Sequence, residues 1–141
     1  MSDFNHDLIA DLRAHDGHAT SGPFVGRPMV ILTTVGAKSG AVRETPLVYS
    51  RDGDRVVIVA SMGGAPSHPS WYHNLVAQPR VTVEIDGERF TAIAHVADAA
   101  ERRRLYDQHA AINPSFLEYE ARTTRVIPVI TLQREASSAA A

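Results

Sequence analysis

Tight turns between β-branched apolar runs are the feature that most constrains how this chain can fold. The segments DGD at 52–54 and DGE at 86–88 are typical of hairpin turns, and runs rich in valine and isoleucine lie beside them. A strand that leaves such a turn pairs antiparallel with the strand that enters it. The chain shows no regular strand–helix–strand alternation and no internal repeat, so we expect an antiparallel sheet built from hairpins.

The apolar and alternating runs predict about six strands in a barrel over about 24–133, followed by a frayed tail at 134–141. The run 43–51 contains Pro46, which lacks the N–H that a ladder needs, so this strand is predicted at a sheet edge or with a bulge. The run 55–61 is apolar throughout and is predicted in the interior of the sheet. The predicted strands cover 29–35, 43–51, 55–61, 80–85, 89–97 and 125–133.

Four helices are predicted around the sheet, and each has a boundary signal. Gly17 ends the first helix, Ser70 or Ser67 caps the second, Asp98 caps the third, and Pro114 lies in the first turn of the fourth. The predicted helices cover 3–16, 70–78, 98–111 and 113–123. The fold class is therefore mainly β or α+β, a small barrel of antiparallel strands with peripheral helices.

The composition fits a single domain, residues 1–141. There are no cysteines, which excludes disulfides, thiolate metal ligands and a cysteine nucleophile and suits the reducing cytoplasm. With 14 basic and 16 acidic residues the formal net charge is −2, which does not indicate nucleic-acid binding. No apolar run is long enough for a membrane span, and the polar N-terminus does not resemble a signal peptide. We therefore predict a cytoplasmic protein without an integral membrane segment.

The sequence TTVGAKSGAVRETPLVY at 33–49 has the features of an anion site. A wide turn can bring Lys38 and Arg43 to one side, and the backbone N–H groups of Ser39 and Gly40 can add donors, so a phosphate group is the natural ligand. The segment is not a nucleotide-triphosphate P-loop, because Lys38 follows an alanine and a strand comes next instead of a helix. The alternative is a solvated hairpin turn whose cations face water.

A second glycine-rich loop, MGGAPSHP at 62–69, follows the predicted interior strand. Gly63 and Gly64 permit the backbone to approach a flat ligand closely. The loop precedes a helix, whose N-terminus favours an anion or a carbonyl oxygen. The alternative is a plain connection with Trp71 buried in the core. Two such loops at the ends of neighbouring strands favour a ligand site.

The side chains themselves do not form a recognisable catalytic set. His68, His73 and His95 lack the carboxylate or cysteine partners that would complete a metal site, so no metal is predicted. The sequence has no G-x-S-x-G nucleophile elbow and no paired carboxylates in an apolar setting. A bound cofactor would therefore have to supply the chemistry.

Five motifs occur together between residues 24 and 133: T-T-x-G-x-K-S-G, R-x-x-P-L, A-S-x-G-G-A-P, P-x-W-Y-x-N-L and R-T-T-R-x-I-P. In this combination the chain resembles the deazaflavin-dependent nitroreductase family, which are split β-barrel oxidoreductases related to FMN-binding barrel proteins. The resemblance implies a split β-barrel and coenzyme F420, an 8-hydroxy-5-deazaflavin, as the redox carrier.

The resemblance also implies which residues hold the coenzyme. Lys38, Ser39 and Arg43 would hold its phosphate, with backbone from Gly40. Ala37 stands where relatives often carry a second basic residue, which would remove one phosphate contact. The residues that would line the deazaflavin ring are Pro46, Ala60, Ser61, Met62, Gly63, Gly64 and Trp71.

The implied reaction is hydride transfer from the reduced coenzyme to an electron-poor small molecule, namely a quinone, an enone or a nitro compound. Ser61 and Tyr119 are the candidate catalytic residues, because either could donate a hydrogen bond to the acceptor oxygen. Met62 stands where relatives often have lysine, while Val48 and Phe116 replace tyrosines of some nitro-reducing members. We therefore expect quinones and enones to be better acceptors than nitroimidazoles. An FMN-binding reductase and a non-catalytic deazaflavin carrier are the alternatives, and a homodimer is left open.

Overall fold

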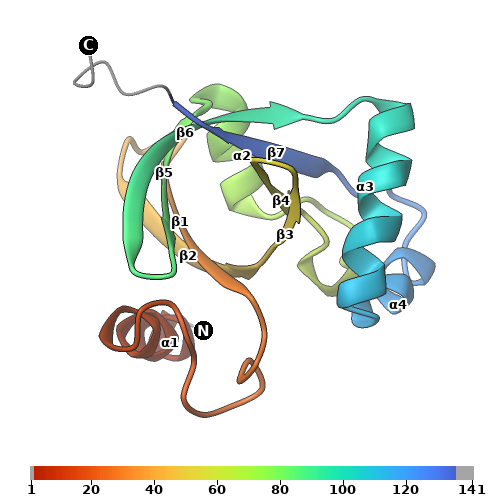
Figure 1. The fold of residues 1–141 in the computed structure, drawn as a ribbon. Coiled ribbons are helices and arrows are strands. Elements are labelled where there is room, and N and C mark those ends of the chain that lie inside the picture. Colours follow the sequence, from red (N-terminus) through yellow and green to blue (C-terminus); the bar gives the residue numbers. More distant parts are fainter. Residues whose placement is uncertain (1, 136–141) are drawn as a thin grey trace.

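The computed structural model describes residues 2–135, which form one antiparallel sheet with helices on its outside (Figure 1). The strand order in the sheet is β2-β1-β5-β6-β7-β4-β3, and every neighbouring pair is antiparallel. The strands are β1 (Met29–Val35), β2 (Val42–Val48), β3 (Ser50–Asp52), β4 (Arg55–Val59), β5 (Arg80–Ile85), β6 (Glu88–Val96) and β7 (Val129–Arg134). The predicted class, a split β-barrel with peripheral helices, is confirmed.

The connection between β2 and β3 explains why the sheet curls into a barrel. These two strands lie at opposite ends of the strand order, yet Tyr49 alone separates them in the chain. The end of β2 therefore lies next to the start of β3, so the sheet curls round as Figure 1 shows, while no ladder among the described strands pairs β2 with β3. The backbone N–H of Tyr49 donates to the carbonyl of Pro28 at 3.1 Å, outside both ladders. The predicted strand 43–51 is thus two strands, which makes seven in place of six.

Two prolines influence the sheet, one by its position in an edge strand and one by limiting the start of a strand. Pro46 lies opposite Ile31 in β2, which is an edge strand of the described sheet, so the predicted edge position is confirmed. The last strand was predicted from residue 125 but begins at Val129, because Pro128 lacks the N–H that would extend the ladder. Arg134 belongs to this strand, so the predicted tail begins too early, and its residues 136–141 lie outside the described residues.

The helices begin and end close to their predicted positions, but one cap differs. Asp98 accepts a hydrogen bond from the N–H of Glu101 at 2.9 Å, as an N-cap should. The predicted serine cap of the second helix is wrong, because Pro69 occupies the N-cap and no side chain caps the helix. The helices are α1 (Ser2–Ala14), the 3-10 turn η1 (Met62–Gly64), α2 (Ser70–Ala77), α3 (Ala99–Ile112) and α4 (Ser115–Ala121). No helix of residues 2–135 is long and apolar enough to cross a membrane.

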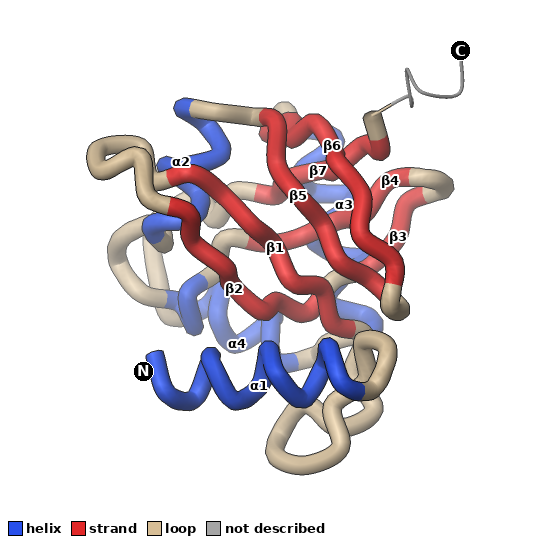
Figure 2. Tube along the Cα trace, turned by 90° about the vertical axis from the view of Figure 1, so that its left-hand side faces the viewer, coloured by secondary structure: helices blue, strands red, loops and turns tan. Residues whose placement is uncertain are grey.

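Three apolar clusters hold the elements together. The barrel interior is filled from every strand but β3 and is closed by Trp71 and Leu75 of α2. A second cluster packs α3 and α4 against β4 and β7, on the side of the barrel seen at the right of Figure 1. A third packs α1 against β1, and Figure 2 shows this helix crossing beneath β1 and β2. The loops between these clusters carry the residues that the sequence singled out.

Candidate functional site

The turn between β1 and β2 is closed by its own backbone. The N–H of Gly36 donates to the carbonyl of Ala41 at 2.7 Å, and the N–H of Gly40 donates to the carbonyl of Gly36 at 2.9 Å. The N–H of Ala41 donates to Ser39 Oγ at 3.1 Å, so this hydroxyl orders the turn while its own hydrogen is free to donate. The N–H of Gly40 thus already has an acceptor within the turn, and its contact with an oxyanion stays a prediction.

Asn74 of α2 fixes this turn to the rest of the molecule, and the sequence analysis missed its role. Its Oδ1 accepts from the N–H of Ala37 at 3.0 Å, and its Nδ2 donates to Thr34 Oγ1 at 3.2 Å. The side chain is buried, so these hydrogen bonds are shielded from water. The asparagine of the P-x-W-Y-x-N-L motif is the one local sequence signal that could have identified this role of Asn74.

An open cavity of about 970 Å³, which we call the anion cavity, lies between this turn and α2. Lys38 and Arg43 line it, as predicted, together with the first residue of α2 and His73. The start of an α-helix carries unsatisfied N–H groups and a partial positive charge, so the cavity gathers several groups that attract an anion. The full lining is Asn5, Gly36, Ala37, Lys38, Ser39, Arg43, Ser70, His73 and Asn74.

A second cavity of about 240 Å³, the apolar cavity, lies beside η1, α4 and β2. It brings together both predicted catalytic residues, Ser61 and Tyr119, with four of the predicted ring-lining residues. The aromatic rings of Phe116 and Tyr119 meet edge to face, with centroids 5.1 Å apart. The full lining is Phe24, Arg27, Pro46, Leu47, Val48, Val59, Ser61, Met62, Gly63, Pro69, Trp71, Ser115, Phe116 and Tyr119.

The two cavities adjoin along the same elements. Ser70 lines the anion cavity while Pro69 and Trp71, its neighbours in the chain, line the apolar cavity. On β2, Arg43 belongs to the first cavity and Pro46 to the second, a separation of roughly 10 Å along an extended strand. The arrangement suits a ligand with an anionic group at one end and a flat apolar group at the other.

Three predicted site residues do not line either cavity. Gly40 is exposed, and Ala60 is fully buried with its carbonyl oxygen accepting a hydrogen bond from Arg125. Gly64 faces α4, because a Cβ built on it would lie 2.6 Å from the carbonyl oxygen of Tyr119. Gly63 has open space at the same position, so it is the glycine that leaves room beside the apolar cavity. Contacts of Gly40, Ala60 and Gly64 with a coenzyme stay predictions.

Arg125 organises the loop after β4, and the sequence analysis assigned it no role. Its guanidinium donates to the carbonyls of Ala60 at 3.1 Å, Ser61 at 2.7 Å and Ala65 at 3.0 Å. Burial lowers the pKa of this guanidinium, but arginine stays protonated at any ordinary pH. The arginine therefore sets the path of the segment that presents Ser61 to the apolar cavity. Nothing in the local sequence indicates this, because its partners lie about 60 residues away in the chain.

The same guanidinium fixes the state of His68. Its Nη1 lies 2.7 Å from His68 Nδ1, and because arginine can only donate, this ring nitrogen must be the acceptor. The imidazole proton is thereby assigned to Nε2. Burial and then the charge of Arg125 lower the pKa of His68, so the ring is neutral at neutral pH.

The basic residues are divided between paired and unpaired ones. Eight of the 14 lysine and arginine residues form ion pairs with carboxylates. The other six have no carboxylate partner among the side chains of residues 4–135. Five of these six lie at the two cavities or on the loop beside them, namely Arg27, Lys38, Arg43, Arg122 and Arg125. Cationic charge is therefore uncompensated where a ligand would bind.

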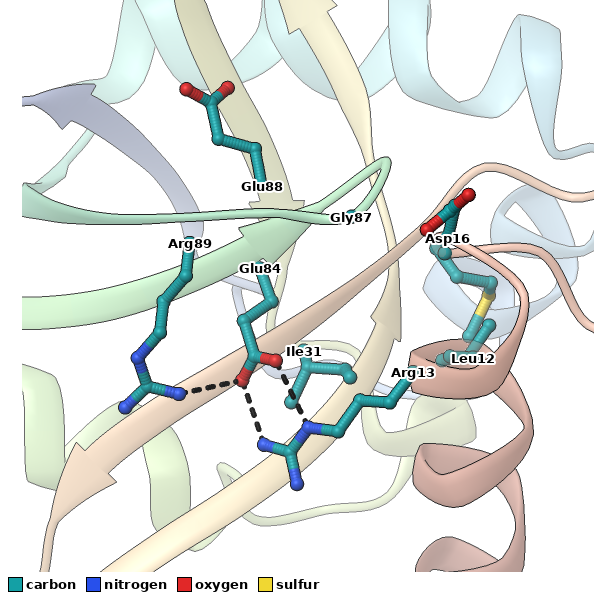
Figure 3. A pocket seen from close by; sticks show the side chains of 10 residues that line it. Leu12, Arg13, Asp16, Ile31, Glu84, Gly87, Glu88 and Arg89 are labelled. Carbon is teal, nitrogen blue, oxygen red and sulfur yellow. Dashed lines mark hydrogen bonds and ion pairs between the residues drawn. The ribbon is translucent and has the colours of Figure 1, made fainter.

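A third cavity, of about 110 Å³ between α1 and the β5–β6 hairpin, shows the opposite pattern (Figure 3). Arg13 of α1 binds Glu84 through two hydrogen bonds of 3.0 and 2.8 Å, and Arg89 binds the same carboxylate at 3.2 Å. Arg13 and Arg89 are thus paired with protein carboxylates. Their ion pairs serve to dock α1 on the sheet, and we do not assign a ligand here.

The fold and the two neighbouring cavities define a split-barrel protein whose cavities suit a ligand with an anionic end and a flat apolar end. A family model described as F420H(2)-dependent quinone reductase matches residues 7–134, and the chain belongs to this family. The resemblance found in the sequence, and with it F420 as the coenzyme of the family, is confirmed.

Individual relatives agree with this assignment. An F420H(2)-dependent quinone reductase of Mycobacterium tuberculosis is 39% identical over 141 residues, covering 92% of this chain and 93% of its own. A solved structure described as an F420-H2 dependent reductase, FDR-A, is 37% identical with a TM-score of 0.70 and covers 76% of this chain and 95% of its own. Another, described as a domain-swapped dimer, is 33% identical with a TM-score of 0.72 and covers 91% of this chain and 93% of its own.

Proposed function

We propose that this protein is an oxidoreductase that uses reduced coenzyme F420 to reduce a quinone. One observation carries the proposal: Lys38 and Arg43, which have no carboxylate partner among the side chains of residues 4–135, line a cavity that neighbours, along α2 and β2, an apolar cavity lined by Ser61 and Tyr119. An anionic coenzyme with a flat ring matches this order of charge and apolar surface. The names of the relatives, reductases that use this coenzyme, support the same function.

The residues present fit the coenzyme at both ends. Lys38, Ser39 and Arg43 would hold the phosphate. Because Ala37 has no basic side chain, it would add no further charged contact to the phosphate. At the other end Gly63, with open space above its Cα, would allow the ring to approach the backbone. When bound, the reduced deazaflavin supplies a hydride. The protein orients the two reactants and excludes water from the place where they meet.

The acceptor would occupy the remainder of the apolar cavity. Ser61 and Tyr119 are its hydroxyl donors, and either can hold a carbonyl oxygen of a quinone. Val48 and Phe116 line the same cavity and offer no hydroxyl, so polar contacts for a nitroimidazole are few. An unpaired polar group in an apolar site costs about 1–3 kcal/mol, which favours quinones and enones over nitro compounds.

The phosphate-binding role is tested by titration of the protein with F420 and with FMN, followed by fluorescence and absorbance. Replacing a charge-assisted contact costs about 1.5–3 kcal/mol, so Arg43→Gln and Lys38→Gln should each weaken F420 binding roughly 10- to 100-fold. Arg51→Gln is the matched control, since Arg51 also lacks a carboxylate partner within residues 4–135 but lies against Tyr49 outside both cavities. Unchanged affinity in both site variants, or preference for FMN, would overturn the assignment.

The acceptor is tested by oxidation of F420H2 with a quinone, an enone and a bicyclic nitroimidazole measured side by side. We expect kcat/KM to be higher for the quinone or enone, and Phe116→Tyr to narrow the difference by adding a hydroxyl to the cavity. Faster turnover of the nitroimidazole by the native protein would show that Val48 and Phe116 do not control acceptor choice. A protein that binds the coenzyme and reduces none of these acceptors would be a carrier.

We propose two further points, one on location and one on assembly. A cytoplasmic location is proposed from the absence of cysteine. A homodimer is proposed because a relative of known structure is described as a dimer. Light scattering over a range of protein concentrations tests the dimer, and a constant monomer mass would exclude it.

A further inference from the structure

Among the side chains of residues 4–135, Arg27 is the one charged group that lines the apolar cavity, and it lies outside the five sequence motifs that indicated the site. It lies in the loop that enters β1, between Gly26 and Pro28. The other lining groups are apolar or neutral, with hydroxyls from Ser61 and Tyr119. A half-buried cation beside such groups gains from an anionic partner, because it has lost part of its contact with water.

The structure does not supply that partner from the protein. Arg27 is half-buried, and no carboxylate among the side chains of residues 4–135 forms an ion pair with it, whereas eight other basic residues are so paired. Its charge is therefore available to a molecule in the cavity.

The backbone holds Arg27 in place on both sides. Its own N–H donates to the carbonyl of Phe24 at 3.1 Å, and the carbonyl of Pro28, the next residue, accepts from the N–H of Tyr49 at 3.1 Å. The ring of Phe24 in turn packs at 6.3 Å from that of Phe4 on α1. The guanidinium thus projects from an anchored loop, which makes it suitable for orienting a ligand.

From this placement we infer that Arg27 contacts the oxygen of the acceptor and stabilises the negative charge that forms there during reduction. The inference rests on the proposed function. A quinone that takes up a hydride, two electrons and one proton, becomes a hydroquinone anion with its charge on oxygen. A proton from solvent then completes the hydroquinone, and the coenzyme, having given up the hydride, releases one proton to solvent and leaves in its oxidised form. A fixed cation beside the oxygen favours the charged state over the neutral quinone and so lowers the barrier.

The first test compares Arg27→Gln, Arg27→Lys and the control Arg51→Gln. Loss of one donor to a developing oxyanion typically lowers kcat by 10²-fold or more, so we expect a fall of about 100-fold in kcat for quinone reduction by Arg27→Gln. We expect Arg27→Lys to recover part of this loss because it keeps the charge without the planar fork. The dissociation constant of F420 should be unchanged in Arg27→Gln, in contrast to Arg43→Gln. Arg51→Gln should match the native protein throughout.

A second readout does not depend on turnover. 4-Nitrophenol is a flat ring with one ionisable oxygen, and its absorbance reports its ionisation. With the coenzyme bound, the probe should ionise at lower pH on the native protein than on Arg27→Gln, since a neighbouring cation stabilises the phenolate. A purely structural role of Arg27 would not produce this shift.

The outcomes separate the two proposals. If the native protein fails to bind F420 or to reduce quinones, the proposed function is wrong. If the native protein does both, but Arg27→Gln reduces quinones at the native rate or leaves the ionisation of 4-nitrophenol unchanged, the inference about Arg27 is wrong. A loss of F420 affinity in Arg27→Gln equal to that in Arg43→Gln would also overturn it, because Arg27 would then be a coenzyme-binding residue.

Discussion

Gly63 and Gly64 are neighbours in η1, but their Cα atoms face different surroundings. Both have positive φ angles, 64° and 82°, so an L-residue at either position carries a cost of about 1–2 kcal/mol. A Cβ on Gly63 meets no atom within 4 Å, whereas a Cβ on Gly64 would lie 2.9 Å from Arg122 Cβ and closer still to Tyr119. Gly64 thus permits η1 to pack on α4, while Gly63 borders the apolar cavity.

We predict that alanine at these two positions separates stability from binding. Gly64→Ala should lower the free energy of unfolding by about 1–3 kcal/mol for the forced contact in addition to the backbone cost. Gly63→Ala should lower the free energy of unfolding only by the cost of the positive φ angle, but it should weaken F420 binding by several-fold or more. Urea denaturation and coenzyme titration on the same preparations measure both effects. Equal stability of the two variants would contradict the different packing of the two glycines.

At the scale of the elements, Arg125 links the chain before β7 to the loop after β4. We predict that Arg125→Met lowers the free energy of unfolding by about 1–3 kcal/mol, because several backbone carbonyls lose their donor. F420 binding and quinone KM should worsen as well, since the loop presents Ser61 and Gly63. Arg122→Met is the control for stability alone, because Arg122 makes one marginal hydrogen bond, of 3.5 Å to the carbonyl of Gly63, and its guanidinium lies 5.8 Å from the ring centroid of Tyr119.

A readout beyond stability distinguishes positioning from packing. Arg125 donates to His68 Nδ1, so its loss should let the pKa of the His68 imidazole rise towards its ordinary value. NMR titration of the histidines would measure this change in Arg125→Met and its absence in Arg122→Met. An unchanged titration of His68 in Arg125→Met would show that the arginine acts on the backbone alone.

The elements themselves were largely predictable, and the site was predictable in part. Hairpin turns and alternating runs predicted the strands, because both patterns are set by residues close together in the sequence. Lys38 and Arg43 were predicted as site residues for the same reason, since they lie close together in one short segment. The break at Tyr49 was missed since it follows from closure of the whole sheet. Arg27 and Arg125 were missed because their importance depends on a cavity and on carbonyls that come from distant parts of the chain.

At the scale of the whole molecule, His109 makes stability depend on pH. It is fully buried in the cluster that joins α3 and α4 to the sheet, its Nδ1 lies 2.8 Å from Ser50 Oγ, and its Nε2 has no hydrogen-bond partner within the described residues. Burial lowers the pKa of His109 from 6.5 to about 4. Between these values the unfolded chain binds a proton that the folded protein does not, so protons favour unfolding.

We therefore predict that the contribution of neutral His109 to the free energy of unfolding is complete above pH 6.5. This contribution is lost progressively as the pH falls towards 4. At 1.36 kcal/mol per pKa unit, His109 accounts for about 3 kcal/mol of this loss. Urea denaturation of the native protein and of His109→Gln over this pH range measures it, and the variant should show a shallower slope whatever its absolute stability. Parallel slopes would show that the pKa of His109 is the same in the folded and the unfolded state.

The single-residue connection at Tyr49 also protects the molecule from its own edges. An exposed edge strand offers unpaired N–H and C=O groups to any passing strand, and this sheet has two such edges, β2 and β3. Because one residue joins them, neither edge can move away without pulling on the other, and the sheet cannot unroll into an open ribbon. The shortness of this link is thus a safeguard against intermolecular strand addition, and lengthening it with flexible residues would leave both edges freer to pair with strands of other molecules.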